Sequence, residues 1–375
     1  MKTTQGEAQK KLEQYVNLPS GSHDRADVNA FADAVQADFE ALGMEVIRHH
    51  DDSVGDTLEC RAGTGEHTLL LLGHMDTVFA HAESWPFRLE GDKAFGPGAM
   101  DMKGGLLVMY FALKEVLPFL PRDTKIICVL NADEEIGSQS SHALMEAHAK
   151  QAFAALSFEP ARPSGALVAQ RKGVISFRIH CTGQRGHAGS AYLECGSAIE
   201  QICRVVNALY TLRDDARSIS INVGRIEGGS RENIIADEAN ASCELRFFDP
   251  GYQEELLTRV REICARPGIK GTTTELYVGA SHPPFKANEK SARLLEIMKQ
   301  IALAQGRCVT AESTGGAGDI AFAGLQGIAA LDGLGIAGFH AHAKAEYALM
   351  SSLLPNAQLA ADLMKSLLQR PEQVM

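Results

Sequence analysis

Three short apolar runs, each followed at once by acidic residues or a histidine, constrain this chain more than any other feature. They are residues 68–72 before Gly73-His74-Met75-Asp76, residues 125–130 before Asn131-Ala132-Asp133-Glu134-Glu135, and Leu156-Ser157-Phe158 before Glu159. Segments with a helical pattern, at 26–42, 103–116 and 138–149, alternate with these strand-like runs. This alternation predicts an α/β fold whose central sheet is mostly parallel and has helices on both faces.

The pattern changes near residue 172. A strand, helix, strand, strand, helix, strand order follows, at 174–182, 197–212, 218–225, 239–247, 252–265 and 273–278. This order is typical of a ferredoxin-like α+β unit. Helical patterns then return at 292–304 and 356–369. We therefore predict one larger domain formed by residues 1–171 and 285–375, with residues 172–284 inserted into it as a second domain.

Composition excludes several classes of function. The formal net charge of −11 argues against a surface that binds nucleic acid, which needs clustered Lys and Arg. No apolar run approaches membrane-spanning length, and the first residues lack the apolar segment of a signal peptide. We therefore predict a cytoplasmic protein with no membrane and no nucleic-acid partner. The eight cysteines form no C-x-x-C pair and are expected to be free thiols.

The residues that follow the strands are expected to meet, because loops at the carboxyl ends of parallel strands converge on one crevice. With an aspartate in a glycine-rich loop and a late histidine, they provide two imidazoles and three carboxylates: His74, Asp101, Glu135, Glu159 and His342. This set suits two divalent metal ions that share one carboxylate, and Glu134 is left to handle a proton. His340 competes with His342, and spacing alone does not choose between them.

Two local geometries add to this prediction. His74 and Asp76 are two residues apart, so on an extended chain they point the same way, and Asp76 can hold the second ring nitrogen of His74. Glu134 and Glu135 are adjacent, so in extended backbone they face opposite sides. One carboxylate is then expected to bind metal while its neighbour faces the substrate water.

The motifs occur in one order along almost the whole chain. They read His-x-Asp-Thr-Val, Gly-Pro-Gly-x-x-Asp-x-Lys-Gly-Gly, Asp-Glu-Glu-x-Gly, Ser-x-Glu-Pro, Gly-His-Ala-Gly and His-x-x-x-Glu-Tyr. By these motifs and their order, the chain resembles the dizinc exopeptidase family that includes glutamate carboxypeptidase, aminoacylase, tripeptidase T and succinyl-diaminopimelate desuccinylase. It looks closest to the glutamate carboxypeptidase branch.

The resemblance implies an enzyme, a zinc-dependent metallopeptidase of carboxypeptidase type or an amidohydrolase. It would use a metal-bridged water to hydrolyse the amide bond to a C-terminal amino acid in small peptides or N-acyl amino acids. The alternatives are an aminoacylase or dipeptidase of the same family, or a metal-free scaffold without catalysis. Because Ala166-Leu167 and His282 stand where glutamate-selective relatives carry basic residues, we expect a neutral or apolar C-terminal side chain.

The resemblance also implies the roles of the ligands. Two Zn²⁺ ions per chain are expected, with Co²⁺ or Mn²⁺ as further candidates. Asp101 would bridge the two ions, with His74 and Glu159 completing one site. Glu135 and His342 would complete the other, His342 being chosen because the family histidine precedes Glu-Tyr by four positions. Glu134 would be the general base, and Asp76 the partner of His74.

In the inserted domain, the resemblance implies a lid that also forms a homodimer. His187 in Gly186-His187-Ala188-Gly189 matches the family histidine that supplies an oxyanion donor from the neighbouring subunit. Asn233 and Arg246 match residues that grip the free carboxylate of the substrate, a role that suits the paired donors of a guanidinium.

Overall fold

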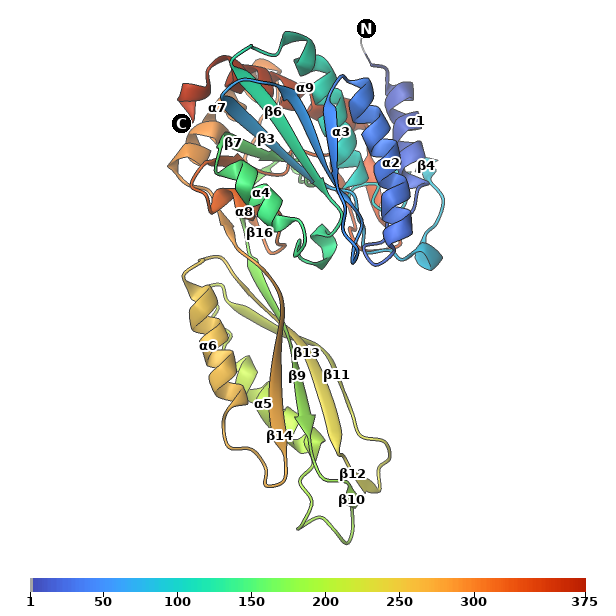
Figure 1. Ribbon diagram of the computed structural model, residues 1–375, viewed down its shortest axis with the longest axis vertical. Helices are drawn as coiled ribbons and strands as arrows, with labels where there is room; N and C mark the ends of the chain where they lie inside the picture. Colours follow the sequence, from blue (N-terminus) through green and yellow to red (C-terminus); the bar gives the residue numbers. More distant parts are fainter. Residues whose placement is uncertain (1–2) are drawn as a thin grey trace. The chain divides into compact units, whose positions relative to one another are not determined.

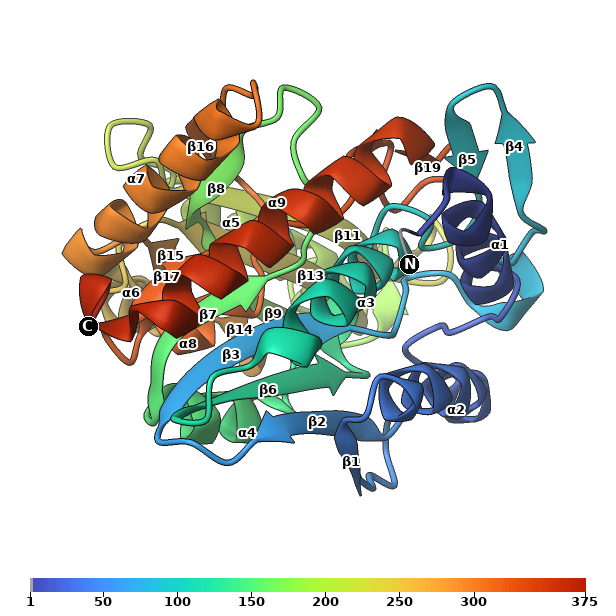
Figure 2. The same ribbon diagram turned by 90° about the horizontal axis from the view of Figure 1, so that it is seen from above.

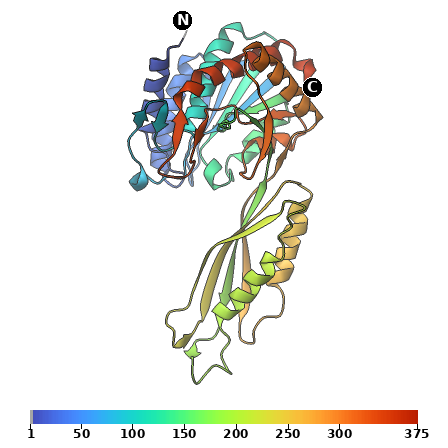
Figure 3. The ribbon, with the colours of Figure 1, turned by 180° about the vertical axis from the view of Figure 1, so that it is seen from behind.

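The computed structural model describes residues 3–375, which form two compact units (Figures 1 and 3). Unit 1 comprises the chain up to Gln170 together with Phe285–Thr314 and Gly318–Met375. Unit 2 comprises Arg171–Pro284 and Gly315–Ala317. Each unit has its own buried apolar core.

Unit 1 is built on a six-stranded sheet. In spatial order its strands are β1 (Glu45–His49), β2 (Thr57–Gly63), β6 (Thr124–Asn131), β3 (His67–His74), β7 (Ala152–Ser157) and β17 (Ala329–Leu331). The last four are mutually parallel, whereas β1 and β2 pair antiparallel at one edge. The prediction of a mostly parallel sheet is confirmed. Strand β2 was not among the predicted strands.

Helices cover both faces of this sheet, as predicted. On one face lie α1 (Gln5–Val16), α2 (Arg25–Ala41), α3 (Lys103–Val116), α7 (Glu289–Ala304) and α9 (Met350–Gln369). Figure 2 shows α3 and α9 in front of the strands. On the other lie α4 (His142–Ala149) and α8 (Ile320–Gly324). Alternate residues of β3 divide between the faces: Leu69 and Leu71 pack in the first core, Leu70 and Leu72 in the second. All are fully buried, as expected for a sheet covered on both sides.

Unit 2 has the strand, helix, strand, strand, helix, strand order expected from the sequence. Its elements are β9 (Gly173–Thr182), α5 (Ala198–Tyr210), β11 (Ser220–Gly228), β13 (Glu238–Phe247), α6 (Tyr252–Cys264) and β14 (Thr273–His282). The strands form an antiparallel sheet in the order β11-β13-β9-β14, the arrangement of a ferredoxin-like unit. Both helices pack on the face that carries Ile175, Phe177 and Ile179 (Figure 1). A two-stranded ribbon joins β10 (Gly186–His187) to β12 (Ile234–Ile235).

Smaller sheets complete unit 1. One has the order β15 (Phe285–Lys286), β8 (Leu167–Arg171) and β16 (Ala311–Thr314). The other runs β18 (Gly338–Phe339), β19 (Tyr347–Leu349), β5 (Lys93–Phe95) and β4 (Arg88–Glu90). All eight cysteines are free. Within residues 3–375, every helix is too short or too polar to cross a lipid bilayer.

One local expectation was wrong. Glu134 and Glu135 do not continue an extended strand, because β6 ends at Asn131 and residues Glu134–Ile136 form a single 3₁₀ turn. The turn ends at Gly137, whose φ of 96° lies in the left-handed region that glycine adopts without strain. The two carboxylates therefore take their directions from a tight turn and not from strand alternation.

Candidate metal centre

The candidate ligands come from loops at one end of the unit 1 sheet. His74 is the last residue of β3, Glu135 follows β6, and Glu159 lies two residues beyond β7. These three strands are parallel neighbours, so their carboxyl ends lie side by side. Asp101 precedes α3, and His342 follows β18. The structure thus brings together five side chains that are scattered along the sequence.

The five side chains form two groups that share Asp101. In the first, His74 Nε2 lies 3.3 Å from Asp101 Oδ1 and 3.5 Å from Glu159 Oε1. In the second, His342 Nε2 lies 3.5 Å from Asp101 Oδ2 and 3.2 Å from Glu135 Oε2. Each group offers one imidazole and two carboxylates, and Asp101 turns one oxygen toward each.

These distances fit metal ions. Bonds of about 2.0–2.1 Å in a tetrahedral zinc site place ligand atoms about 3.3–3.4 Å apart, close to all four values. His74 Nε2, Asp101 Oδ1 and Glu135 Oε1 are buried, and within residues 3–375 they have no hydrogen-bond partner. Because buried polar atoms are costly to leave unpaired, a cation coordinated by them would remove that cost. The residues present therefore fit a pair of divalent ions.

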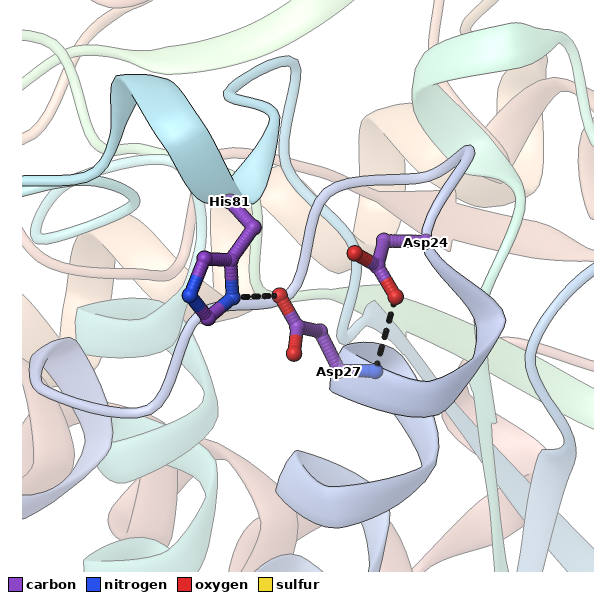
Figure 4. Close-up of side chains that lie close together, drawn as sticks. All are labelled: Asp24, Asp27 and His81. Carbon is purple, nitrogen blue, oxygen red and sulfur yellow. Dashed lines mark hydrogen bonds and ion pairs between the residues drawn. The ribbon is translucent and has the colours of Figure 1, made fainter.

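A third cluster of similar composition makes a useful contrast. Asp24, Asp27 and His81 also lie close together in unit 1 (Figure 4). There, His81 Nδ1 lies 2.6 Å from Asp27 Oδ2, which is a hydrogen-bond length and too short for two atoms that ligate one ion. Asp24 caps α2 by accepting from the backbone N–H of Asp27. These interactions satisfy the cluster as a helix cap and an ion pair.

Asp76 connects several parts of the centre. It is fully buried, and His74 Nδ1 lies 3.3 Å from its Oδ1 and 3.0 Å from its backbone oxygen. Its two carboxylate oxygens also accept from the backbone N–H groups of Glu134 and Glu135, both at 3.2 Å. The Ser22 hydroxyl donates to Oδ2 at 2.7 Å. Asp76 therefore orients an imidazole and fixes the turn that carries two candidate carboxylates.

Glu346 supports the loop that carries Asp101. Its carboxylate is fully buried and accepts from the backbone N–H groups of Gly98, Met100 and Asp101 at 3.3, 2.9 and 3.1 Å. Burial, together with the charge of Asp101, raises the pKa of Glu346 to about 7. Glu346 belongs to the His-x-x-x-Glu-Tyr motif, but neither it nor Ser22 was among the predicted site residues. Their partners lie too far away in the sequence for spacing to reveal them.

Burial and crowded charge perturb the ionisation of the centre. Burial and the negative charge of Glu159 raise the pKa of Glu134 well above its usual value. Hydrogen bonds with Asp101 and Glu135 raise the pKa of His342 to about 10. A cation bound by His342 would displace the proton that this shift favours on its imidazole.

The structure distinguishes the two late histidines. His342 points to Asp101 and Glu135, whereas the ring of His340 packs against the rings of Phe339 and Tyr347. Both histidines have left-handed backbone, with φ of 65° for His340 and 63° for His342. Such conformations cost energy for a residue with a Cβ and often occur at functional sites.

The remaining predicted residues, His187, Asn233 and Arg246, lie in unit 2. His187 in β10 and Asn233 beside β12 are exposed, and the Asn233 backbone oxygen accepts from the N–H of Ala188. Arg246 in β13 makes two hydrogen bonds with Glu244 and donates to the backbone oxygen of Gly315.

Comparison with known proteins places these features in one family. The model of peptidase family M20/M25/M40 matches residues 70–366. Carboxypeptidase G2 of Pseudomonas sp. (strain RS-16) is 32% identical over 369 residues, covering 96% of this chain and 88% of that protein. A succinyl-diaminopimelate desuccinylase of Novosphingobium aromaticivorans is 28% identical over 277 residues, covering 67% of this chain and 72% of that enzyme.

Solved structures show the same fold at lower identity. An M20 family metallo-carboxypeptidase of Sulfolobus solfataricus superposes with a TM-score of 0.80 at 17% identity, covering 96% of this chain and 98% of that chain. The aminopeptidase PepT of Bacillus cereus gives a TM-score of 0.77 at 21% identity, with the same coverage of 96% and 98%. Because the family model spans most of the chain and one relative matches nearly its full length, the chain belongs to peptidase family M20/M25/M40.

Proposed function

We propose that this protein is a two-metal exopeptidase or amidohydrolase that releases a C-terminal amino acid from small peptides or N-acyl amino acids. As a member of its family, the chain is a hydrolase of peptide or acyl-amino-acid amide bonds. The single observation that carries the finer proposal is Asp101, whose two carboxylate oxygens belong to two different ligand groups. One shared carboxylate is the arrangement expected for co-catalytic ions.

The proposed ligands are those of the two groups. His74, Asp101 and Glu159 would hold one ion, and Asp101, Glu135 and His342 would hold the other. Zn²⁺ is the proposed ion, with Co²⁺ or Mn²⁺ compatible with the same nitrogen and oxygen donors. A pair of such ions, when bound, lowers the pKa of a shared water and polarises the scissile carbonyl.

Glu134 is the proposed general base. Its carboxylate lies in the 3₁₀ turn beside Glu135, and Asp76 fixes that turn through the backbone. Burial and the neighbouring carboxylates raise the pKa of Glu134. A carboxylate with such a raised pKa accepts the proton of the attacking water and later donates it to the departing amine.

Unit 2 is proposed to act as lid and dimerisation domain. His187 would donate a hydrogen bond to the developing oxyanion in the site of the partner subunit. Asn233 and Arg246 would bind the free carboxylate of the substrate, and for this Arg246 would exchange its hydrogen bonds with Glu244 for bonds to the ligand. A homodimer through unit 2 and a cytoplasmic location are parts of the same proposal.

The substrate separates the main proposal from its alternatives. Carboxypeptidase G2 and the structural relative from Sulfolobus are carboxypeptidases by name, whereas other relatives are a desuccinylase and an acetylornithine deacetylase. A carboxypeptidase, an aminoacylase and a dipeptidase differ only in what flanks the amide bond. We favour a carboxypeptidase-like specificity because carboxypeptidase G2 matches 96% of this chain at 32% identity.

The test combines metal analysis with a substrate panel. The purified protein should hold about two zinc equivalents per chain after dialysis against zinc, and the Asp101→Asn variant should lose most of both. Dipeptides and N-acyl amino acids with varied C-terminal residues should be cleaved by the loaded enzyme and not after chelation. If the protein binds no metal after dialysis against zinc, the non-catalytic scaffold is favoured. If the loaded enzyme cleaves N-acyl amino acids and no dipeptides, the aminoacylase is favoured.

A further inference from the structure

Unit 1 contains a cavity of about 210 Å³ that includes none of the candidate metal ligands. It lies among the loop that follows Glu159, helix α7 and helix α9. Buried apolar side chains form much of its wall, including Leu167, Met298, Val309, Leu334 and Leu359. A concave, apolar space with a few polar groups is the usual form of a small-molecule site.

Arg307 supplies an unusual charge to this wall. Its guanidinium is about half buried, and it donates to the backbone oxygen of Pro355 at 2.9 Å and to Asn356 Oδ1 at 2.7 Å. Among the described residues, no carboxylate lies within ion-pair distance of it, and burial lowers the pKa of Arg307. A partly buried cation without a counter-charge is costly, and an anion that pairs with it would remove much of that cost.

A second arginine at the same cavity shows the contrast. Arg162 also lines the space, but its Nε lies 3.1 Å from Glu312 Oε1. Its charge is therefore already balanced by a carboxylate of the protein. Arg307, by comparison, uses two of its five N–H donors on neutral oxygens and keeps three for solvent or a ligand.

We infer that this cavity binds a small carboxylate that bears a short apolar chain. The carboxylate would pair with the Arg307 guanidinium, whose planar set of donors matches two carboxylate oxygens. The apolar chain would lie among Leu167, Val309 and Leu359 and would displace water from their surfaces. Because the cavity is smaller than the roughly 300–1,000 Å³ of sites for drug-sized ligands, the occupant is small.

This inference does not depend on the proposed catalytic function. Neither the ligand groups nor Glu134 contribute to the cavity wall. A carboxylate could, however, also bind to zinc at the candidate metal centre. The experiment therefore has to separate the two places within the same metal-loaded protein.

The test measures binding of hexanoate, and of the uncharged hexanamide, by titration calorimetry with the zinc-loaded protein. Wild type should bind hexanoate at least tenfold more tightly than hexanamide. Arg307→Gln should weaken hexanoate binding about tenfold or more, because it removes the cation and keeps a polar side chain of similar length. Asp101→Asn, which disrupts the candidate metal centre, should leave hexanoate affinity within about twofold of wild type.

A second variant addresses the apolar wall. Val309→Phe adds volume from the loop between α7 and β16 and should reduce binding of both probes. It also decides the matter if Arg307→Gln shows no cooperative unfolding transition. The inference is overturned if wild type binds neither probe, if charge makes no difference, or if both Arg307→Gln and Val309→Phe retain wild-type affinity. Loss of binding in Asp101→Asn alone would place the carboxylate at the metal centre and would equally overturn it.

Discussion

The carboxylate of Glu346 accepts a hydrogen bond from the backbone N–H of Asp101 at 3.1 Å, which ties a residue near the end of the chain to the shared ligand. The same carboxylate also accepts from Gly98 and Met100. We expect Glu346→Ala to leave these buried donors unpaired and to lower the free energy of unfolding by about 2–3 kcal/mol. Urea unfolding of the metal-free protein measures this change.

Metal titration gives the second readout for Glu346. Because Asp101 would be less well positioned, zinc affinity should fall together with stability. Glu296→Ala is the matched control, since Glu296 is exposed on α7 and pairs with Lys299 on the same helix. Unchanged stability and zinc affinity in Glu346→Ala would show that Glu346 does not position this loop.

Ser22 offers a gentler test of the network around Asp76. Ser22→Ala removes the hydroxyl that donates to Asp76 Oδ2 at 2.7 Å and leaves the backbone intact. Loss of a hydrogen bond to a residue that orients a metal ligand typically reduces metal affinity or activity about 10–100-fold, and we expect the lower end of that range. Competition with a zinc chelator measures the affinity. Ser53→Ala, at an exposed hydroxyl bonded to Asp51, should match wild type.

Adjacent glutamates should give opposite phenotypes. Glu134→Gln should keep both zinc ions and lose about 10²–10⁴-fold in kcat, because an amide accepts no proton from water at neutral pH. Glu135→Gln should instead lose zinc, since a weaker ligand replaces a carboxylate beside His342. Metal content and turnover are measured on the same preparations. If Glu134→Gln keeps normal turnover, the base must be another residue.

Mixed subunits test the proposed role of His187 in the partner's site. Glu134→Ala and His187→Ala homodimers should each be nearly inactive. When their subunits are exchanged, a mixed dimer contains one site with both residues intact, so part of the activity should return. Mass spectrometry of intact dimers verifies that exchange has occurred. Absence of rescue in verified mixed dimers would mean that His187 does not act across subunits.

The pH dependence of stability should depend partly on Glu59, a buried glutamate of β2 that is not one of the candidate ligands. Burial opposes its ionisation, but hydrogen bonds from Arg61 and His49 outweigh burial and lower the pKa of Glu59. The folded pKa lies below the unfolded one, so this group stabilises the fold above the unfolded pKa of about 4.3. That contribution is lost as the pH falls through the folded pKa.

Glu59→Gln should therefore flatten the loss of stability on acidification. Denaturant unfolding at a series of pH values, with metal chelated in both proteins, measures the slope. Glu66→Gln, at an exposed glutamate, provides the comparison. An acid slope in Glu59→Gln as steep as that of wild type would contradict the linkage.

Sequence patterns predicted most of the fold. Helix α3 has the predicted bounds of Lys103–Val116, because a glycine-rich loop precedes it and Pro118 follows it. Helix α9 begins at Met350, six residues before the predicted start, and continues through Pro355, which costs a single backbone hydrogen bond near the start of the helix. Strand β2 was not predicted, although Leu58, Cys60 and Ala62 alternate with Glu59 and Arg61 as in a half-buried strand. Glu59 is buried only because His49, Arg61 and His148 surround it.

Some residues of the candidate site could be predicted from the sequence and others could not. Residues that carry a local signature, such as His74 before Asp76 or Glu159 before Pro160, could be found from the sequence. Ser22 and Glu346 could not, since their roles depend on contacts with residues distant in the chain. The 3₁₀ turn at Glu134–Ile136 could not be predicted from strand alternation, because it depends on the left-handed backbone of Gly137.

The chain leaves unit 1 through β8 and returns to it through β15, and these two strands are hydrogen-bonded neighbours. The N–H of Ala287 donates to the oxygen of Ala169 at 3.0 Å, so the two crossing points lie one strand spacing apart. A short linker in place of residues 172–284 would therefore close the larger unit with little loss of chain entropy. The two units could thus be expressed as separate proteins divided at these crossing points, one carrying the candidate metal ligands and the other the ferredoxin-like unit.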